Sequence, residues 1–256
     1  MNLSFYKYQA AGNDFVLIDN RDGDISLTAD QIAHLCDRRF GVGADGVIIV
    51  ARDSEADYHV TYFNPDGTQS LCGNGCRSAV DLAHRLGLAD AHSVFNAYDG
   101  KHVADRLTDG RIRIQMNDVN KIEKALDGYY LDTGSPHFVR FVDSLEDYPV
   151  FEEGRQIRYN PVFPIGANAN FIQRIDDHTL SLRTYERGVE QETLACGTGA
   201  TASALAASLN GYKSPVTLKA RGGDLMIDFI RHSDSHFTDI YLTGPARLVY
   251  KGVIEI

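Results

Sequence analysis

"SLCGNGCRSAV" spans residues 70–80 of the chain, and "ACGTGATASAL" spans residues 195–205. Each stretch places Cys-Gly-x-Gly directly before a run of small and apolar residues that is typical of a buried helix. The two cysteines, Cys72 and Cys196, are about 124 residues apart. Two such helix starts in one chain indicate an internal duplication.

Three further pairs of segments occur in the same order at nearly the same offset of about 123 residues. "YQAAGNDFVLID" resembles "LDTGSPHFVRFVD", "TYFNPDG" resembles "TYERGVE", and "VFNAYDG" resembles "TLKARGG". We therefore predict two repeats of one fold, residues 1–117 and residues 118–245. The last strand, about 246–256, has no counterpart in the first repeat and is expected to complete it.

Hydrophobic patterns predict mostly strands, with a long helix after each Cys-Gly-x-Gly motif. The fold class is α+β, with each repeat a curved, antiparallel-rich sheet wrapped around a central helix and the active site in the cleft between the repeats. The predicted helices cover residues 28–38, 73–87 and 197–210. The predicted strands are 3–8, 14–19, 46–51, 57–63, 93–97, 101–107 and 111–116 in the first repeat, and 129–133, 137–142, 168–174, 179–185, 215–219, 224–230 and 237–243 in the second.

Charge and composition exclude several classes of protein. The net charge of −10 argues against a nucleic-acid or anionic-membrane partner. The N-terminal residues do not have the pattern of a signal peptide, and no apolar run approaches the ~18–20 residues that a membrane helix needs. We expect a cytoplasmic protein. Four cysteines without two C-x-x-C pairs give no indication of a structural zinc site, and no metal is expected.

The two helix starts suggest a chemistry. The first N–H groups of a helix bind carboxylates readily, and a thiol placed there is expected to be acidified. In a duplicated protein, two equivalent cysteines would face each other and hold a small carboxylate between them. One sulfur could remove the α-proton from one face while the other returned a proton to the opposite face, which is racemisation or epimerisation of an amino acid. A helix end stabilises a nearby anion by only about 0.3–1 kcal/mol, so the site must also exclude water.

Eight motifs along nearly the whole chain resemble the diaminopimelate epimerase family. They are "AAGNDFVLID", "RRFGVGADG", "YFNPDG", "CGNG", "GSPHFV", "NANFIQ", "YERGVEQETLACGTGA" and "LTGPA", in the family's order. The resemblance implies an isomerase that interconverts LL- and meso-diaminopimelate in lysine and peptidoglycan biosynthesis. It implies no cofactor, pyridoxal phosphate included, a small amino-acid substrate as the partner, and a homodimer as one expected assembly.

The resemblance also implies roles for individual residues. Cys72 and Cys196 are the acid/base thiols, and His137 and Glu186 tune the reacting centre. Arg187 is suited to the distal carboxylate by the fork geometry of its guanidinium. The substrate-binding residues that the resemblance implies are Asn13, Asn64, Gly73, Asn74, Asn168, Glu186, Arg187, Gly197 and Thr198.

The sequence departs from the family pattern at two places. The usual C-G-N-G-x-R-C reads "CGNGCRS" here, so Cys76 and Ser78 have exchanged character. The asparagine of the family's G-N-P-H is Ser135 here, and we do not include it in the predicted site. Cys36 and Cys76 are expected to be structural.

Other interpretations remain open. An epimerase of the same fold could act on proline, hydroxyproline or histidine, although Asn74 stands where proline racemases usually carry histidine. A redox or metal-binding protein could use Cys72 and Cys76, and a non-catalytic binding module could share the fold. Asn13 and Asn64 could simply form turns. Glu186 and Arg187 could be a surface ion pair.

Overall fold

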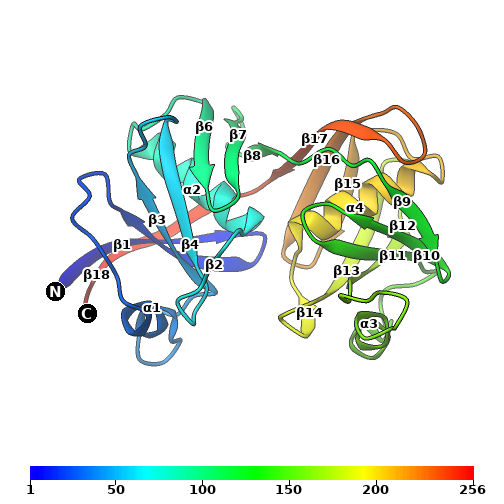
Figure 1. Ribbon diagram of the computed structural model, residues 1–256, viewed down its shortest axis with the longest axis horizontal. Helices are drawn as coiled ribbons and strands as arrows, with labels where there is room; N and C mark the ends of the chain where they lie inside the picture. The colour runs from blue at the N-terminus through cyan, green and yellow to red at the C-terminus, as the bar shows by residue number, and fades with distance from the viewer. The chain divides into compact units, whose positions relative to one another are not determined.

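The computed structural model describes all residues, 1–256. The chain forms two compact units, residues 1–114 together with 245–256, and residues 115–244 (Figure 1). The predicted repeats were residues 1–117 and 118–245, with residues 246–256 completing the first. None of the helices is both long enough and apolar enough to span a membrane.

The first unit is a sheet folded over one long helix. Its strands are ordered β18–β1–β2–β3–β4–β6–β7–β8, with β2–β3 and β4–β6 parallel and the other pairs antiparallel. The elements are β1 (Asn2–Ala10), β2 (Asn13–Asp19), α1 (Ala29–Cys36), β3 (Gly46–Ala51), β4 (Tyr58–Phe63), β5 (Gln69–Ser70), α2 (Gly73–Arg85), β6 (His92–Ala97), β7 (Gly100–Arg106), β8 (Ile112–Gln115) and β18 (Arg247–Glu255).

The second unit repeats this topology. Its strands are ordered β9–β10–β11–β12–β13–β15–β16–β17, again with two parallel pairs, β11–β12 and β13–β15. The elements are β9 (Ile122–Ala125), β10 (Gly128–Asp132), β11 (Pro136–Phe141), α3 (Val150–Arg158), β12 (Asn168–Arg174), β13 (Thr179–Glu186), β14 (Gln191–Thr193), α4 (Gly197–Ser208), β15 (Val216–Ala220), β16 (Gly223–Arg231) and β17 (Phe237–Gly244).

The last strand of the chain fills a vacant position in the duplicated pattern. β18 pairs antiparallel with β1, as β9 pairs antiparallel with β10. In the second unit the pairing strand β9 directly precedes β10 in the sequence, whereas in the first unit the corresponding strand is β18, from the C-terminal residues 247–255.

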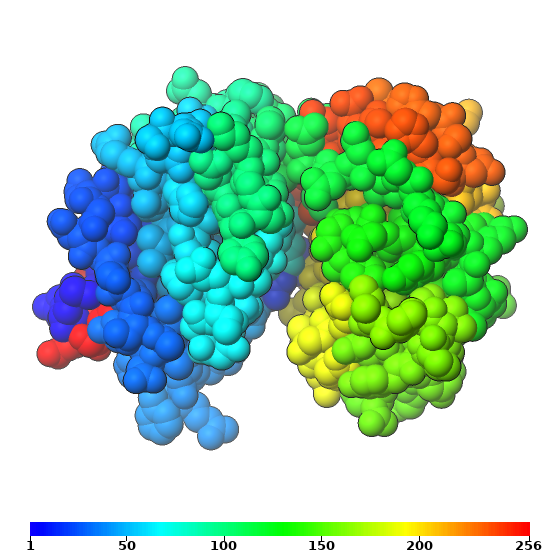
Figure 2. Space-filling view, in the orientation of Figure 1, coloured from blue at the N-terminus to red at the C-terminus, as the bar shows by residue number.

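The central helices are buried almost completely. Every residue of α2 from Asn74 to Ala83 is buried, and every residue of α4 except Thr198 is buried. α2 contacts β1–β4, β7 and β18, and α4 contacts β10–β13 and β15–β17. In Figure 2, green atoms of the segment from β9 to β11 cover the place where Figure 1 draws α4. The predicted curved sheet around a central helix is confirmed in each unit.

Two elements, α3 and β9, were not predicted from the sequence. α3 lies between β11 and β12, where α1 lies between β2 and β3, so the second unit also has the extra helix that we predicted only for the first. Its Gly154 lowers helix propensity, yet a Cβ there would lie 2.3 Å from Cβ of Tyr185, so the glycine permits close packing on β13. β9 lies just after the predicted boundary between the two repeats, and it is an edge strand with no buried residue.

Candidate active site

Each central helix begins directly after a cysteine. Cys72 precedes α2 with φ −129° and ψ 110°, and Cys196 precedes α4 with φ −120° and ψ 115°. Both are N-caps in the same extended conformation, and their carbonyl oxygens accept the first helical hydrogen bonds at 2.8 and 2.9 Å. The first N–H groups of a helix have no partner within the helix and carry a positive partial charge. Each cysteine therefore lies beside backbone donors suited to a carboxylate.

Packing explains the second glycine of each Cys-Gly-x-Gly motif. A Cβ atom on Gly199 would lie 2.4 Å from Oδ1 of Asn170 and 3.3 Å from Sγ of Cys196. A Cβ atom on Gly75 would lie 3.0 Å from Cδ1 of Ile48. Glycine at these positions lets the first turn of each helix lie against its neighbours without displacing them.

The thiol of Cys196 is buried and hydrogen-bonded. Its Sγ accepts a hydrogen bond from the N–H of Gly199 at 3.4 Å and lies 3.4 Å from Oγ1 of Thr198. Burial raises the pKa of Cys196, and the charge of Glu186 raises it further, while hydrogen bonds from Thr198 and Gly199 lower it. The prediction of an acidified thiol is therefore wrong for Cys196 in this structure, because desolvation outweighs the donors at the helix start.

Glu186, at the end of β13, faces the cysteine. Its Oε1 accepts a hydrogen bond from Oγ1 of Thr193 at 2.5 Å, and its carboxyl group also contacts the thiol of Cys196. Burial raises the pKa of Glu186. Glu186 is the last residue of β13, and its carboxyl group forms no ion pair with Arg187 in the turn that follows. The interpretation of these two residues as a surface ion pair is wrong.

His137 is completely buried and uses both ring nitrogens. Nε2 lies 2.9 Å from Oγ1 of Thr198 and 3.0 Å from Oγ of Ser135, and Nδ1 lies 3.0 Å from Nδ2 of Asn170. Burial, followed by the positive charge of Arg187, lowers the pKa of His137 to about 3. The imidazole is therefore neutral near pH 7 and acts there as a hydrogen-bonding group.

Asn168 connects the start of β11 to the turn that begins at Arg187. Its Oδ1 accepts a hydrogen bond from the backbone N–H of Arg187 at 2.8 Å. Its Nδ2 donates to the carbonyl oxygen of Pro136 at 2.9 Å and to Oγ of Ser135 at 3.2 Å. The guanidinium of Arg187 donates to the carbonyl oxygen of Ile165 at 3.1 Å and forms no ion pair with a carboxylate of the protein. Its charge is thus available to an anionic ligand.

In the first unit, a chain of side-chain hydrogen bonds begins at Asn74, two residues after Cys72. Asn74, in the first turn of α2, donates to Oδ1 of Asn13. Asn13 donates in turn to Oδ2 of Asp45 at 3.0 Å. Oδ1 of Asn74 accepts from Nη2 of the fully buried Arg77 at 2.7 Å. Asn13 is the first residue of β2 and lies directly after the tight β1–β2 turn, so it is not itself a turn residue.

Asn64 is hydrogen-bonded within its own turn. Its Nδ2 donates to the carbonyl oxygen and to Oγ1 of Thr68, at 3.2 and 3.0 Å, and to Oγ of Ser70 at 3.1 Å. Its own carbonyl oxygen accepts from the N–H of Gly67, which has φ +82°. Asn64 therefore heads a turn between β4 and β5, as composition alone suggested.

The structure gathers most of the predicted residues into two clusters, one in each unit. We call them the Cys72 cluster and the Cys196 cluster. The Cys72 cluster holds Asn13, Cys72, Gly73 and Asn74. The Cys196 cluster holds His137, Asn168, Glu186, Arg187, Cys196, Gly197 and Thr198. Asn64 has no hydrogen bond to either cluster.

Comparison with known proteins reproduces the duplication. The sequence model of the family described as "Diaminopimelate epimerase" matches the chain twice, over residues 5–125 and 129–249. The chain belongs to the diaminopimelate epimerase family. The two matches correspond to the two repeats, and together they contain every residue of both clusters.

Relatives in the diaminopimelate epimerase family match the chain over nearly its full length. The diaminopimelate epimerase of Flavobacterium psychrophilum is 42% identical over 260 residues, which cover 98% of this chain and 100% of the relative. That of Chlorobaculum tepidum is 41% identical over 258 residues, covering 96% and 99%. A phenazine biosynthesis protein of the PhzF family from Bacillus anthracis, 16% identical, superimposes with a TM-score of 0.75 and covers 100% of both chains, which shows a shared fold.

Two residues that hydrogen-bond to the predicted site residues of this diaminopimelate epimerase family member were not included in the prediction. Ser135 contacts His137, Asn168 and Thr198, although we had left it out as a departure from the family pattern. Asn170 was missed as well. The available signal was its spacing of two residues from Asn168, which places both amides on one face of β12.

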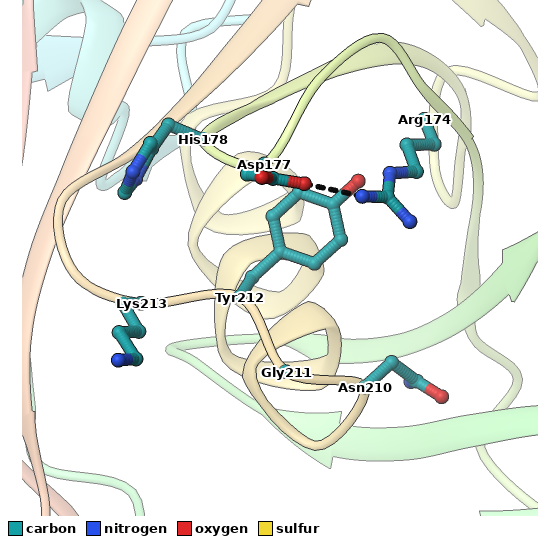
Figure 3. A pocket seen from close by; sticks show the side chains of 7 residues that line it. All are labelled: Arg174, Asp177, His178, Asn210, Gly211, Tyr212 and Lys213. Atoms are coloured by element: carbon teal, nitrogen blue, oxygen red, sulfur yellow. Dashed lines mark hydrogen bonds and ion pairs between the residues drawn. The ribbon is translucent and has the colours of Figure 1, made fainter.

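A pocket of about 390 Å³ lies at the other end of α4 from Cys196 (Figure 3). Its lining residues Asn210, Gly211, Tyr212 and Lys213 follow the end of the helix, whose 12 residues span about 18 Å. None of the predicted site residues lines this pocket. It is therefore separate from the candidate active site.

Proposed function

We propose that this protein interconverts LL- and meso-diaminopimelate by moving the proton on one α-carbon. The observation that carries the proposal is the matched pair of helix starts. Cys72 and Cys196 have the same N-cap conformation, and each is followed by glycine and by a residue with a hydrogen-bonding side chain, Asn74 and Thr198. Membership of the diaminopimelate epimerase family supports the choice of substrate.

In the proposed reaction, the two thiols act on the two faces of the α-carbon. One cysteine, as the thiolate, takes the α-proton, so that a C–H bond breaks and an S–H bond forms. The other, as the thiol, gives its proton to the opposite face of the same carbon and becomes the thiolate. Charge is conserved, and no oxidant or cofactor is needed.

The carboxylate next to the reacting carbon must be stabilised while negative charge develops on it. The N–H groups at the starts of α2 and α4 are suited to this task, since fixed donors in a site that excludes water stabilise developing charge strongly. Arg187 is the proposed partner of the distal carboxylate, because a guanidinium binds a carboxylate through two parallel hydrogen bonds.

Glu186 and His137 support the thiol of Cys196. Glu186 contacts the sulfur, and His137 reaches it through the hydroxyl of Thr198. Both thiols must stay reduced for the reaction, and the cytoplasm keeps thiols reduced. We therefore infer that the protein works in the cytoplasm.

The test is to incubate LL-diaminopimelate with the protein in D₂O and to follow the α-protons by NMR. We expect meso-diaminopimelate to appear with deuterium at the inverted carbon, while the remaining LL substrate stays protonated early in the reaction. Absence of exchange would overturn the proposed function. Equal labelling of substrate and product from the start would overturn the assignment of two separate bases.

A further inference from the structure

We propose that Asn170 is a positioning residue of the Cys196 cluster: it fixes the proton of His137 on Nε2 and thereby directs the hydroxyl of Thr198 toward the sulfur of Cys196. The inference rests on the proposed catalytic role of Cys196. It concerns a residue that the resemblance to the family did not single out.

The orientation of the Asn170 amide follows from its neighbours. Asn170 is completely buried on β12, and its Nδ2 lies 2.9 Å from the carbonyl oxygen of Phe138. A carbonyl oxygen can only accept a hydrogen bond, so the NH₂ group and not the amide oxygen must face it. The other end agrees, because Oδ1 accepts from the hydroxyl of Thr184 at 3.0 Å.

This orientation determines the tautomer of His137. The same NH₂ group lies 3.0 Å from Nδ1 of the imidazole and donates its second hydrogen there. Nδ1 must therefore carry a lone pair, and a neutral ring must carry its proton on Nε2. The ring is neutral because its burial lowers the pKa of His137 to about 3.

The protonated Nε2 then sets the direction of the Thr198 hydroxyl. Nε2–H faces the hydroxyl oxygens of Thr198, 2.9 Å away, and of Ser135, 3.0 Å away, and because the nitrogen carries the proton neither hydroxyl can donate to the ring. The hydroxyl proton of Thr198 is left to point elsewhere, and Sγ of Cys196 lies 3.4 Å from its Oγ1. With the opposite tautomer, Nε2 would accept from these hydroxyls, and a Thr198 hydroxyl that donates to the nearer ring nitrogen gives nothing to the sulfur.

The consequence concerns the ionised form of Cys196. An O–H donor stabilises a thiolate much more than a thiol, since hydrogen bonds to charged groups are the strong ones. The Asn170–His137–Thr198 relay therefore opposes the effects of burial and of Glu186 on the same sulfur. Asn170 also packs against the start of α4, where a Cβ atom on Gly199 would lie too close to the amide oxygen of Asn170.

The test uses the full-length protein and the Asn170→Asp variant. Long-range ¹H–¹⁵N NMR identifies the tautomer of His137, and we expect an Nε2–H ring in the native protein. A carboxylate at position 170 would accept from Nδ1 and move the proton there. We expect iodoacetamide to alkylate Cys196 roughly 10- to 100-fold more slowly in this variant at pH 8, measured on its own peptide by mass spectrometry. A native ring protonated on Nδ1 would overturn the proposal.

A double-mutant cycle separates the relay from the negative charge that Asn170→Asp adds. Thr198→Val removes the hydroxyl and should slow alkylation of Cys196 by a similar factor. Through a relay, Asn170→Asp should then slow it little further in the Thr198→Val background. An undiminished effect in that background would show that the new charge acts directly and would overturn the proposal.

Thr184→Val is the matched control for disturbance of the buried cluster. It removes the partner of Oδ1 but leaves the NH₂ group facing Phe138, so the Nε2–H tautomer and the reactivity of Cys196 should persist. Loss of that reactivity with an unchanged tautomer would count against the relay. None of these measurements needs diaminopimelate, so failure of the proposed substrate and failure of the relay are distinguishable.

Discussion

Asn74, in the first turn of α2, donates a hydrogen bond to Asn13, which lies 61 residues earlier at the start of β2. This bond joins the helix start that follows Cys72 to the first predicted substrate contact. Arg77 holds the other end of the Asn74 amide, because its Nη2 donates to Oδ1 at 2.7 Å. The buried guanidinium thereby dictates that Nδ2 of Asn74 faces Asn13.

The role of Arg77 gives the first prediction. Arg77→Met should lower kcat/KM for diaminopimelate by roughly tenfold or more, because the amide of Asn74 loses the donor that orients it. Burial lowers the pKa of Arg77 to about 10, and one nitrogen of its guanidinium has no hydrogen-bond partner. Arg77→Met removes a buried charge but leaves Oδ1 of Asn74 and the carbonyl oxygen of Pro245 without this donor, so the free energy of unfolding should fall by about 1–3 kcal/mol.

The control for this prediction is Arg85→Met, on the same helix. Arg85 is about half exposed, pairs with Asp81 and touches neither cluster, so its replacement should leave kcat/KM unchanged. Urea unfolding checks the stability of both variants. Full activity in Arg77→Met would show that Asn74 keeps its orientation without the guanidinium.

The second prediction concerns the four cysteines. Cys72→Ala and Cys196→Ala should each lower epimerisation by ~10²–10⁴-fold, the usual effect of losing a general acid or base. Cys36→Ala and Cys76→Ala should stay active, since both thiols lie in hydrophobic cores and their burial raises the pKa of each. The measurement is ¹H NMR of the α-protons, with circular dichroism to establish folding. A folded but inactive Cys76→Ala would move the first catalytic thiol by one helical turn.

The helices and strands were predictable where consecutive residues of one segment show a clear hydrophobic pattern. β12, predicted and observed at residues 168–174, has a run of buried residues that only a central strand accommodates. α2 and α4 were predictable because small and apolar residues continue over three turns. α3 was not, since only Val150, Gly154 and Ile157 are buried in its nine residues.

The site was predictable in its residues but not in its connections. His137 and Thr198 are hydrogen-bonded across 61 residues of sequence, and no local pattern records that contact. The same holds for Arg77, whose partner Pro245 lies 168 residues away. The direction of the pKa shift of Cys196 could not be predicted from the sequence either, because it depends on whether burial outweighs the hydrogen-bond donors at the helix start.

The third prediction concerns the recognition of the substrate's far end. Arg187→Met should raise KM for diaminopimelate because a charge-assisted contact to the distal carboxylate is lost. Arg183→Met is the matched control, because Arg183 lies four residues earlier, in β13, and its guanidinium is already paired with Glu192 at 2.7 Å. Steady-state kinetics check both. If the native protein racemises lysine as efficiently as it epimerises diaminopimelate, Arg187 does not read the distal carboxylate.

The fourth prediction uses the charge of Glu186. That charge raises the pKa of Cys196, so Glu186→Gln should increase the thiolate fraction and speed alkylation of Cys196 at pH 8. The same variant should slow epimerisation, if the carboxyl group takes part in proton transfer at the sulfur. Peptide mass spectrometry reports the first effect and NMR the second. Slower alkylation in Glu186→Gln would show that the carboxylate favours the thiolate, contrary to its charge.

The fifth prediction concerns stability in acid. Burial lowers the pKa of His137 to about 3, against about 6.5 in an unfolded chain. Between these pH values the unfolded chain binds a proton at this histidine and the native protein does not. The free energy of unfolding therefore decreases as pH falls from about 6.5 toward 3. Within that window, one such histidine changes the free energy of unfolding by about 1.4 kcal/mol per pH unit.

His137→Gln removes this titration and keeps a side chain that can both donate and accept hydrogen bonds. The variant should be less stable than the native protein at pH 7, because its amide cannot reproduce all the contacts of the ring. The difference in the free energy of unfolding should shrink as pH falls to about 4. Urea unfolding at closely spaced pH values measures both curves. Parallel curves across this range would mean that His137 binds a proton in the folded protein at an ordinary pH, and the neutral ring on which the Thr198 contact depends would then be lost.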